Sequence, residues 1–340
     1  MSVSAPIVTV LMPVYNNAAY LREAIDSILG QTLRNLEFLI IDDGSSDESP
    51  QIVESYADAR IRLIRHESNL GLIESLNQGL DLARGKYVAR MDGDDISSAA
   101  RLATQVSFME SNPSVGVCGT WAVMSGKAAQ RPLRHPLTHD EIRAKLLFEC
   151  ALAHPSVILD RKQFEHAGLR YDQRFPRVED YALWVRCAES TRLANIGRTL
   201  LTYRMHETSV GSLHKDEQNA VASVVRAGQL ENLGIQVSPA EQKIHDSLSQ
   251  REYGLDRAYV EASEEWLMKL QRANRRHGRY AEPAFSRALA DRWFGLCAAG
   301  VSRGLLTLRE CFASPLARQD RFPSRQRFKV LWQRLRKAPH

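Results

Sequence analysis

The sequence predicts an α/β domain, built on a mainly parallel sheet flanked by helices, followed by a helical C-terminal region. Short apolar runs alternate with amphipathic stretches up to about residue 120, which is the pattern of strands joined by crossover helices. After residue 216 only helical patterns recur. The 340-residue chain is also too long for one small domain. We therefore expect a domain at residues 1–215 and a helical region at 216–340.

The strands of the first part are expected where short apolar runs lie between turn-forming residues. They are residues 7–12, 36–41, 61–64, 87–91 and 115–121. Helical periodicity fills the intervals, and the breakers Gly85 and Pro113 end two of the helices. These helices are residues 18–29, 48–57, 73–83 and 101–110. Because a helix follows each of the first four strands, the strands should run parallel.

Further helices are expected in the middle and at the end of the chain. Thr138 and Glu141 have the spacing of a capping box, which predicts a helix through residue 147. Leu183 and Trp184 have the spacing of a buried helical face over residues 178–188. In the second part, helices are expected at residues 220–233, 258–274 and 284–308.

Cysteine usage and hydropathy indicate a cytoplasmic protein. The five cysteines are odd in number and include no CxxC pair, which favours neither a disulfide framework nor a zinc site. The N-terminus has no basic leader, and no apolar run approaches the roughly 20 residues that span a bilayer. We expect a protein that is soluble or peripheral on the inner face of the cell membrane.

The C-terminal tail is strongly basic. The formal net charge is +5 overall, but residues 318–340 alone carry +7. Phe328, Leu331, Trp332 and Leu335 have the spacing of one apolar helical stripe. Such a helix could lie on an anionic membrane surface or pack against the protein's own core, and both readings stay open. Nucleic acid is not expected as a partner, because no nucleic-acid motif is present.

Polar residues cluster where strands of the predicted sheet end. Asparagines follow the first strand at positions 16 and 17, aspartates follow the second at 42 and 43, and three more follow the fourth at 92, 94 and 95. Ligands bind at this edge of open parallel sheets, so we expect the three groups to converge. The carboxylates at 92–95 suit a hard cation such as Mg²⁺ or Mn²⁺. Taken singly, each group could also be an ordinary turn.

The order and spacing of several motifs resemble those of the inverting nucleotide-sugar glycosyltransferases of family 2, which have the GT-A fold. The resemblance runs from about residue 7 to 210. The matching motifs are Pro-Val-Tyr-Asn-Asn at 13–17, Ile-Asp-Asp-Gly-Ser-Ser-Asp at 41–47, Asn-Leu-Gly-Leu at 69–72, Asp-Gly-Asp-Asp at 92–95, Glu-Asp-Tyr at 179–181 and Tyr-Arg-Met-His at 203–206.

The resemblance implies roles for the donor-binding residues. Tyr15 would pack on the nucleobase and Asp43 would contact the base, with Pro13, Asn16 and Arg204 in the same donor site. Asp94 and Asp95 would bind ribose and metal, with Asp92 as the other candidate ligand. His206 would complete the metal and diphosphate site, although a lone histidine is more often a surface residue.

Asp180 is implied as the general base, and the residues around it agree. Glu179 and Asp180 stand at the start of a helix, where the helix dipole favours the ionised form. Displacement of a nucleoside diphosphate requires a base for the acceptor's proton, and Asp180 could supply it. Both acids could instead merely cap the helix.

The sequence thus predicts an inverting hexosyltransferase (EC 2.4) that requires Mn²⁺ or Mg²⁺. The expected donor is a nucleoside-diphosphate sugar, a UDP-sugar first, and the expected acceptor is a saccharide or a lipid-linked molecule in bacterial polysaccharide, lipopolysaccharide or glycolipid assembly. A nucleotidyltransferase would need a Gly-rich basic loop after the first strand, and Pro13-Val14-Tyr15-Asn16-Asn17 is not one. A non-catalytic nucleotide-sugar-binding module would have lost the clustered acids, which are present here.

Overall fold

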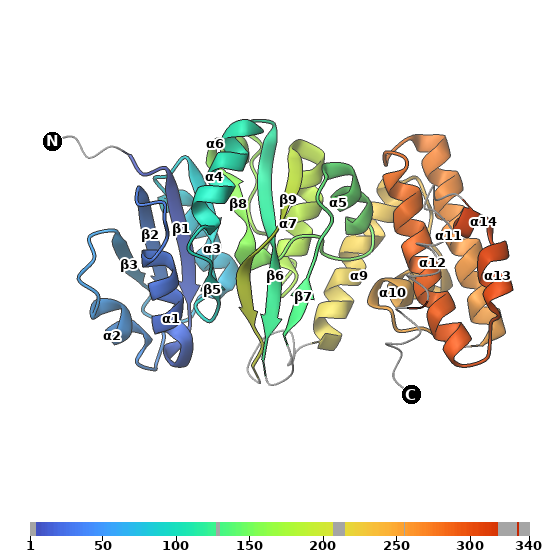
Figure 1. Cartoon of the computed structure of the whole chain (residues 1–340), viewed down its shortest axis with the longest axis horizontal. Helices are drawn as coiled ribbons and strands as arrows, with labels where there is room; N and C mark the ends of the chain where they lie inside the picture. The colour runs from blue at the N-terminus through green and yellow to red at the C-terminus, as the bar shows by residue number, and fades with distance from the viewer. Residues whose placement is uncertain (1–4, 127–129, 207–214, 255, 319–331, 333–340) are drawn as a thin grey trace. The chain divides into compact units, whose positions relative to one another are not determined.

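The computed structural model describes residues 5–126, 130–206, 215–254, 256–318 and 332, and the chain divides into two compact units (Figure 1). The sheet unit comprises Met1–Ile142 and Cys150–Gln218, and the helical unit comprises Arg143–Glu149 and Asn219–His340. The sequence pattern did not predict that the short segment Arg143–Glu149 belongs with the C-terminal helices.

The N-terminal half of the sheet is parallel, as predicted. Strand β1 (Val8–Val14) lies between β2 (Leu36–Asp42) and β4 (Tyr87–Arg90), and β3 (Ile61–Arg65) lies beyond β2 (Figure 1). The pairing of Val14 with Asp42 brings the ends of β1 and β2 side by side. Strands β1, β2 and β4 are buried along their whole length, because helices cover both faces of such a sheet.

Crossover helices connect these strands at the predicted positions. Each presents an apolar face to the sheet; in α1 that face is Leu21, Ala24, Ile25 and Ile28. The helices are α1 (Ala18–Leu29), α2 (Ser49–Glu54), α3 (Leu72–Leu82) and α4 (Arg101–Ser111).

The other half of the sheet is mixed, and most of its strands were not predicted. Strand β6 (Val115–Ser125) pairs antiparallel with β8 (Ile158–Asp160) and parallel with β9 (Arg192–Arg204). Antiparallel pairs also join β4 to β8, β5 (Ile96–Ser97) to β9, and β7 (Arg131–Leu133) to β6. Strands β5, β7 and β8 are too short for a periodic signal. The long β9 lacks one because its burial does not alternate.

Short helices flank this second half of the sheet. They are α5 (His139–Leu146), the 3₁₀ turn η1 (His154–Ser156), α6 (Arg161–His166) and α7 (Glu179–Ser190). The hydroxyl of Thr138 donates a hydrogen bond of 3.0 Å to the side chain of Glu141, next to the start of α5. Helix α7 buries Leu183 and Trp184, as its spacing indicated.

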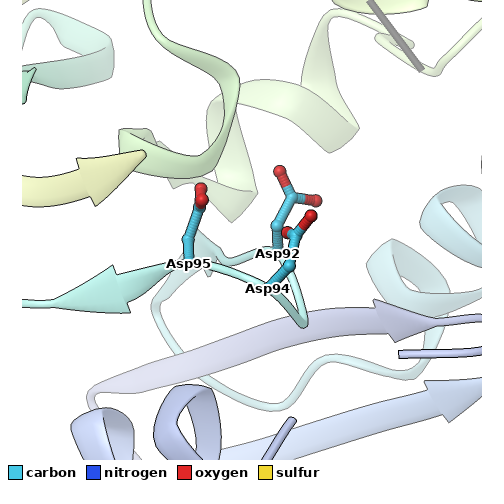
Figure 2. Close-up of side chains that lie close together, drawn as sticks. All are labelled: Asp92, Asp94 and Asp95. Atoms are coloured by element: carbon cyan, nitrogen blue, oxygen red, sulfur yellow. The ribbon is translucent and has the colours of Figure 1, made fainter. Parts of the chain in front are cut away.

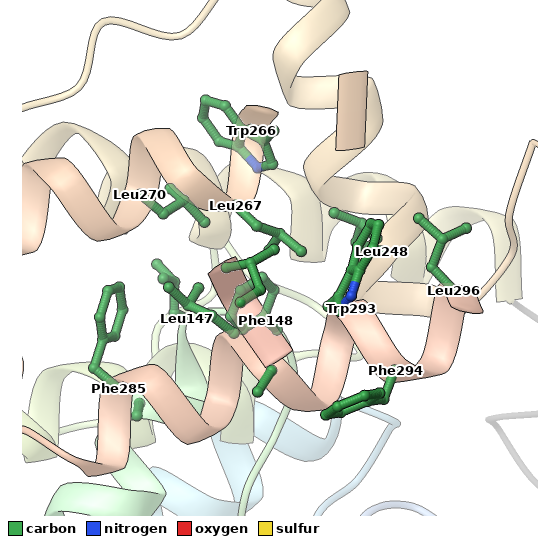
Figure 3. Close-up of a cluster of buried hydrophobic side chains, with 14 of the residues drawn as sticks. Leu147, Phe148, Leu248, Trp266, Leu267, Leu270, Phe285, Trp293, Phe294 and Leu296 are labelled. Atoms are coloured by element: carbon green, nitrogen blue, oxygen red, sulfur yellow. The ribbon is translucent and has the colours of Figure 1, made fainter. Parts of the chain in front are cut away.

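All described elements of the helical unit are α-helices. They are α9 (Lys215–Asn232), which begins in the sheet unit, α10 (Pro239–Gln250), α11 (Arg257–His277), α12 (Ala284–Ser302), α13 (Leu308–Ala313) and α14 (Pro315–Arg318). Their core includes Phe148, Trp266, Phe285 and Trp293 (Figure 3).

Two helix predictions for this unit were wrong. The helix expected at 284–308 ends at Ser302, because Gly304 takes a left-handed conformation and a new capping box begins at Thr307. Helix α10 was missed, although Ser238 and Glu241 form a capping box at its start.

None of the helices within the described ranges is both long and apolar enough to cross a membrane. Residues 319–331 and 333–340, which hold most of the predicted amphipathic tail, lie outside the described part of the chain.

Candidate active site

Three aspartates crowd together where β4 ends. Oxygen atoms of Asp92, Asp94 and Asp95 all lie within 4.8 Å of one another. The three side chains project from the turn between β4 and β5 toward the same side (Figure 2). At this spacing three carboxylates repel one another strongly unless a cation or protons neutralise them.

Asp95 is the most deeply buried of the three, with 1% of its surface exposed. Its Oδ1 accepts a hydrogen bond of 2.8 Å from the backbone N–H of Arg204. Its Oδ2 is buried and has no hydrogen-bond partner among the described residues. Burial, together with the charges of Asp92 and Asp94, raises the pKa of Asp95 to about 8. An unpaired carboxylate oxygen facing two further carboxylates fits a hard divalent cation, so these residues are suited to hold Mn²⁺ or Mg²⁺.

Two buried arginines next to the cluster were not predicted from the sequence. Arg90, the last residue of β4, donates to Asp92. Burial raises the pKa of Asp92 to about 6 even though Arg90 opposes the shift. Arg101, fully buried at the start of α4, donates a 2.6 Å hydrogen bond to the carbonyl of Arg90 and so ties the strand end to the helix. A charged residue at the end of an apolar strand, as in Tyr-Val-Ala-Arg at 87–90, is the signal that could have revealed Arg90.

His206 reaches the cluster from β9, where the sequence motif placed it. Its Nε2 lies 2.8 Å from Oδ2 of Asp94, and its ring stacks on Tyr20 with 4.8 Å between ring centroids. The guanidinium of Arg204 lies 4.9 Å from the centre of the Tyr20 ring and pairs with Glu23 at 2.9 Å. The segment 204–206 is therefore held over α1, with its histidine directed at the carboxylates.

The turns after β1 and β2 are tied to each other and to the carboxylate turn. Asn16 accepts a 2.9 Å hydrogen bond from the backbone N–H of Ser46, and its own N–H donates to Ser45. Gly93 lies so close to Asn17 that a Cβ there would be 3.0 Å from Asn17 Oδ1. The three polar groups thus meet at one edge of the sheet, as predicted.

At the same edge Tyr15 presents an aromatic face to solvent. Its side chain is 48% exposed, whereas Pro13, two residues earlier in β1, is buried. Asn16, which follows it, has a positive φ of 52°, a conformation that asparagine tolerates better than most residues. An exposed ring at the end of a buried strand is available for stacking on a base.

Asp43 organises the segment at residues 69–72. It is 3% exposed, and it accepts hydrogen bonds of 2.9 Å from the backbone N–H groups of both Leu70 and Gly71. His66 Nδ1 lies 2.7 Å from Asp43 Oδ1, and His66 Nε2 lies 2.9 Å from Gln78 Oε1. Neither His66 nor Gln78 was predicted from the sequence, since neither lies in a recognisable motif.

Asp180 lies in the first turn of α7, within electrostatic reach of the cluster. Burial raises its pKa, and its charge contributes to the raised pKa of Asp92. Its Oδ1 accepts a 2.6 Å hydrogen bond from the N–H of the adjacent Tyr181, while Cys150 Sγ lies 3.6 Å from its Oδ2. The N-cap of α7 is Val178, and this helix start has no side-chain cap, so the carboxylate of Asp180 is not in the usual capping geometry. Burial also raises the pKa of Glu179, to about 7.

The chain is similar in sequence to glycosyltransferases. The model of the family "Glycosyl transferase family 2" matches residues 9–166. An uncharacterized glycosyltransferase of Haemophilus influenzae is 32% identical over 66% of this chain and 73% of its own length. The putative glycosyltransferase EpsE of Bacillus subtilis is 35% identical over 61% and 75%. The Escherichia coli UDP-Glc:alpha-D-GlcNAc-diphosphoundecaprenol beta-1,3-glucosyltransferase WfgD is 30% identical over 61% and 80%.

Solved structures share the fold at low sequence identity. S. aureus TarS 1–349, solved in complex with UDP-GlcNAc, superposes with a TM-score of 0.56 at 17% identity, over 97% of this chain and 91% of that one. A mannosyltransferase from Pyrobaculum calidifontis, solved with GDP-Man and Mn²⁺, gives a TM-score of 0.53 at 16% identity, over 97% and 87%. The likeness extends over nearly the whole chain.

Proposed function

The chain belongs to glycosyl transferase family 2 and is a nucleotide-sugar glycosyltransferase, and on this premise we propose that it inverts the anomeric centre in a metal-dependent transfer. The observation that carries the proposal is the group of three carboxylates at the end of β4, in which one buried oxygen has no partner among the described residues. Mutual repulsion makes such a group unfavourable without a cation, and these residues would hold a divalent cation whose charge offsets that repulsion.

In this proposal the residues of the sheet edge divide the work. Asp92, Asp94, Asp95 and His206 would hold the cation, and its chemistry would be to stabilise negative charge on the leaving diphosphate. Tyr15 stacks on the nucleobase beside Pro13, and Asn16, Asp43 and Arg204 line the donor site. Asp43 contributes by holding the backbone at 69–72 as well as by facing the base.

We propose that Asp180 is the general base. The acceptor oxygen forms a bond to the anomeric carbon as the bond to the diphosphate breaks, and the hydroxyl proton passes to a carboxylate oxygen of Asp180. Attack from the face opposite the leaving group inverts the configuration. Because burial raises the pKa of Asp180, its carboxylate is a stronger base than an exposed aspartate.

We propose a hexosyl donor, with a UDP-sugar first, and a saccharide or lipid-linked acceptor in glycan assembly. The named glucosyltransferase from E. coli uses UDP-Glc and a diphosphoundecaprenol-linked sugar. TarS was solved with UDP-GlcNAc, whereas the Pyrobaculum calidifontis mannosyltransferase was solved with GDP-Man, so these two neighbours carry different nucleobases. A lipid-linked acceptor would bring the enzyme to a membrane surface, where the basic tail after residue 317 would associate with anionic lipid.

Donor binding measured with and without a divalent ion tests the proposal. We expect UDP to bind in the presence of Mn²⁺ and to lose most of its affinity in chelator, because the carboxylates would otherwise repel the diphosphate. Asp94→Ala and Asp95→Ala should each abolish the gain from Mn²⁺, whereas Asp81→Ala, an exposed aspartate paired with Arg170, should keep it. Equal UDP affinity of the unmodified chain in Mn²⁺ and in chelator would refute the metal-dependent reaction.

A further inference from the structure

A cationic cavity lies within the helical unit, far along the chain from the carboxylates. Its volume is about 250 Å³, well above the roughly 10–15 Å³ that one water molecule needs. Four basic residues of α11 line it: Lys269, Arg272, Arg276 and His277. The opposite wall is the segment at residues 234–236 that follows α9. We propose that this cavity binds a phosphoryl group, independently of the transfer reaction proposed above.

The spacing on α11 gathers these cations on one face. Positions 269, 272, 273, 276 and 277 follow the i, i+3, i+4, i+7, i+8 pattern, so their side chains share one side of the helix. The remaining sides bury Trp266, Leu267 and Leu270 in the core. The cationic face is therefore the face that α11 has available for a ligand.

The two arginines of the cavity have no neutralising partner in the described part of the chain. Arg272 and Arg276 are exposed, and among the residues that the structure describes neither forms an ion pair or a hydrogen bond. Lys269 does have a partner, since its Nζ lies 2.5 Å from Glu241. No carboxylate is among the described residues that line the cavity. Two guanidinium groups one helical turn apart can each donate a pair of hydrogen bonds to phosphate oxygens.

Helix stabilisation alone does not account for this arrangement. Basic residues favour a helix C-terminus, but the effect is confined to the last turn. Helix α11 ends at His277, so Lys269 and Arg272 lie beyond that range. The opposite wall is also shaped for close approach: Gly234 has a φ of 77°, and a Cβ there would lie 2.7 Å from His277 Nε2. Glycine at this position keeps the wall against His277 and the cavity beside it open.

Inorganic pyrophosphate is the probe for the first experiment. Its binding to the full chain is measured by calorimetry in chelator and in a phosphate-free buffer, so that the carboxylate cluster holds no metal. Arg272→Gln/Arg276→Gln should weaken binding by about tenfold or more, given the strength of charge-assisted hydrogen bonds. The matched control is Arg275→Gln/Arg303→Gln, which removes two exposed arginines of the same unit that do not line the cavity. It should change the dissociation constant less than twofold.

Vesicles distinguish a lipid headgroup from a soluble phosphate. Binding is measured to phosphatidylcholine vesicles with and without phosphatidic acid, using the same two variant pairs. If the cavity variant, but not the control variant, loses the gain from phosphatidic acid, the phosphoryl group is that of a lipid. If the cavity variant, but not the control variant, loses pyrophosphate binding and keeps the gain from phosphatidic acid, the ligand is soluble. Both results support the site. Equal losses in the cavity and control pairs in both assays, or no binding of either probe by the unmodified chain, would overturn it.

Discussion

The sheet unit buries carboxylates beside one another, whereas the helical unit buries charged groups beside opposite charges. At the end of β4, Asp92, Asp94 and Asp95 converge, and Oδ2 of Asp95 has no partner among the described residues. In the helical unit, Arg292 pairs with Glu149, and Arg226 pairs with Asp246 at 2.6 Å.

One neutral side chain in the core of the helical unit is also paired on both sides. Buried His245 lies between the carbonyl of Leu147, at 3.0 Å, and the indole N–H of Trp266, at 3.2 Å. Like charges that lie together, with one buried oxygen unpaired among the described residues, point to the sheet edge as the place where an external ligand would act. The contrast supports the proposal that the carboxylate cluster binds a cation, and this can be tested by removing single charges from each unit.

The largest effect is expected at Asp180. Asp180→Asn preserves size but cannot take the acceptor's proton, so transfer should fall by roughly 10²- to 10⁴-fold. Donor affinity should change little, since the donor contacts come from other strands. The measurement is steady-state transfer alongside UDP binding in Mn²⁺. Near-normal transfer, or retention of configuration in the product, would remove Asp180 from the mechanism and leave the acids of α7 a structural role.

Glu149→Gln tests the helical unit, where the charge of Glu149 is paired with Arg292. Burial would raise the pKa of Glu149, but Arg292, Lys145 and Arg251 outweigh it and lower the pKa. Loss of this carboxylate removes the anionic partner of the buried guanidinium of Arg292, and because the Glu149 side chain is 36% exposed, the unfolding free energy should fall by about 1–2 kcal/mol. Urea denaturation measures it. Glu261→Gln, which breaks the exposed pair with Arg257, is the control and should change stability by less than about 0.5 kcal/mol.

Asp95→Asn should change the free energy of unfolding in the opposite direction and stabilise the chain. The pKa of Asp95 is about 8 in the folded chain, against 3.8 when unperturbed. Between these values the folded chain keeps a proton that the unfolded chain loses, so stability falls as pH rises toward 8. In chelator at pH 8, Asp95→Asn should therefore raise Tm, by about 5 °C for a gain of roughly 2 kcal/mol.

The pH profile checks the same substitution. The two proteins should converge near pH 4, and some slope should remain in the variant because Asp92 has a raised pKa of about 6. Mn²⁺ should stabilise the unmodified chain and not the variant. If Asp95→Asn destabilises the chain at pH 8, as Glu149→Gln does, the charge of Asp95 stabilises the folded chain. The contrast between the two units would then be wrong.

The smallest effect on catalysis is expected from removing the residues after Ala317. Donor hydrolysis should be unchanged, while association with anionic vesicles should weaken, since each basic residue near such a surface contributes roughly 1 kcal/mol. Vesicle sedimentation at low and high salt measures the change. Equal vesicle binding by the full and shortened chains would argue against a membrane role for the tail.

The sequence predicted the parallel half of the sheet because local and global patterns agree there. Apolar runs coincide with β1 to β4, and the helix at residues 18–29 was placed to the residue. The mixed half was harder, because β5 has two residues and β9 pairs with β6 through several register shifts. Pairings between residues far apart in sequence leave no periodic trace in either strand.

The residues of the candidate site also fall into those that the sequence predicted and those that it did not. The acids that a ligand would contact lie in short motifs at strand ends, so Asp43, Asp94, Asp95 and Asp180 could be named from the sequence. The groups that hold them, such as Arg90, Arg101 and His66, could not, because each acts on a partner through tertiary packing. Their importance depends on burial, and burial is not visible in a single sequence.

The contact between β9 and the carboxylate turn also has a consequence for how the protein is made. The N–H that binds Asp95 lies 109 residues further along the chain, and the histidine that faces Asp94 lies 112 residues further. At about 5–20 residues per second, a ribosome needs roughly 5–20 seconds to synthesise that interval. During that time the nascent β1 to β4 sheet carries its aspartates without the strand that completes them. The proposed donor site therefore stays incomplete until the last third of the sheet unit has been synthesised.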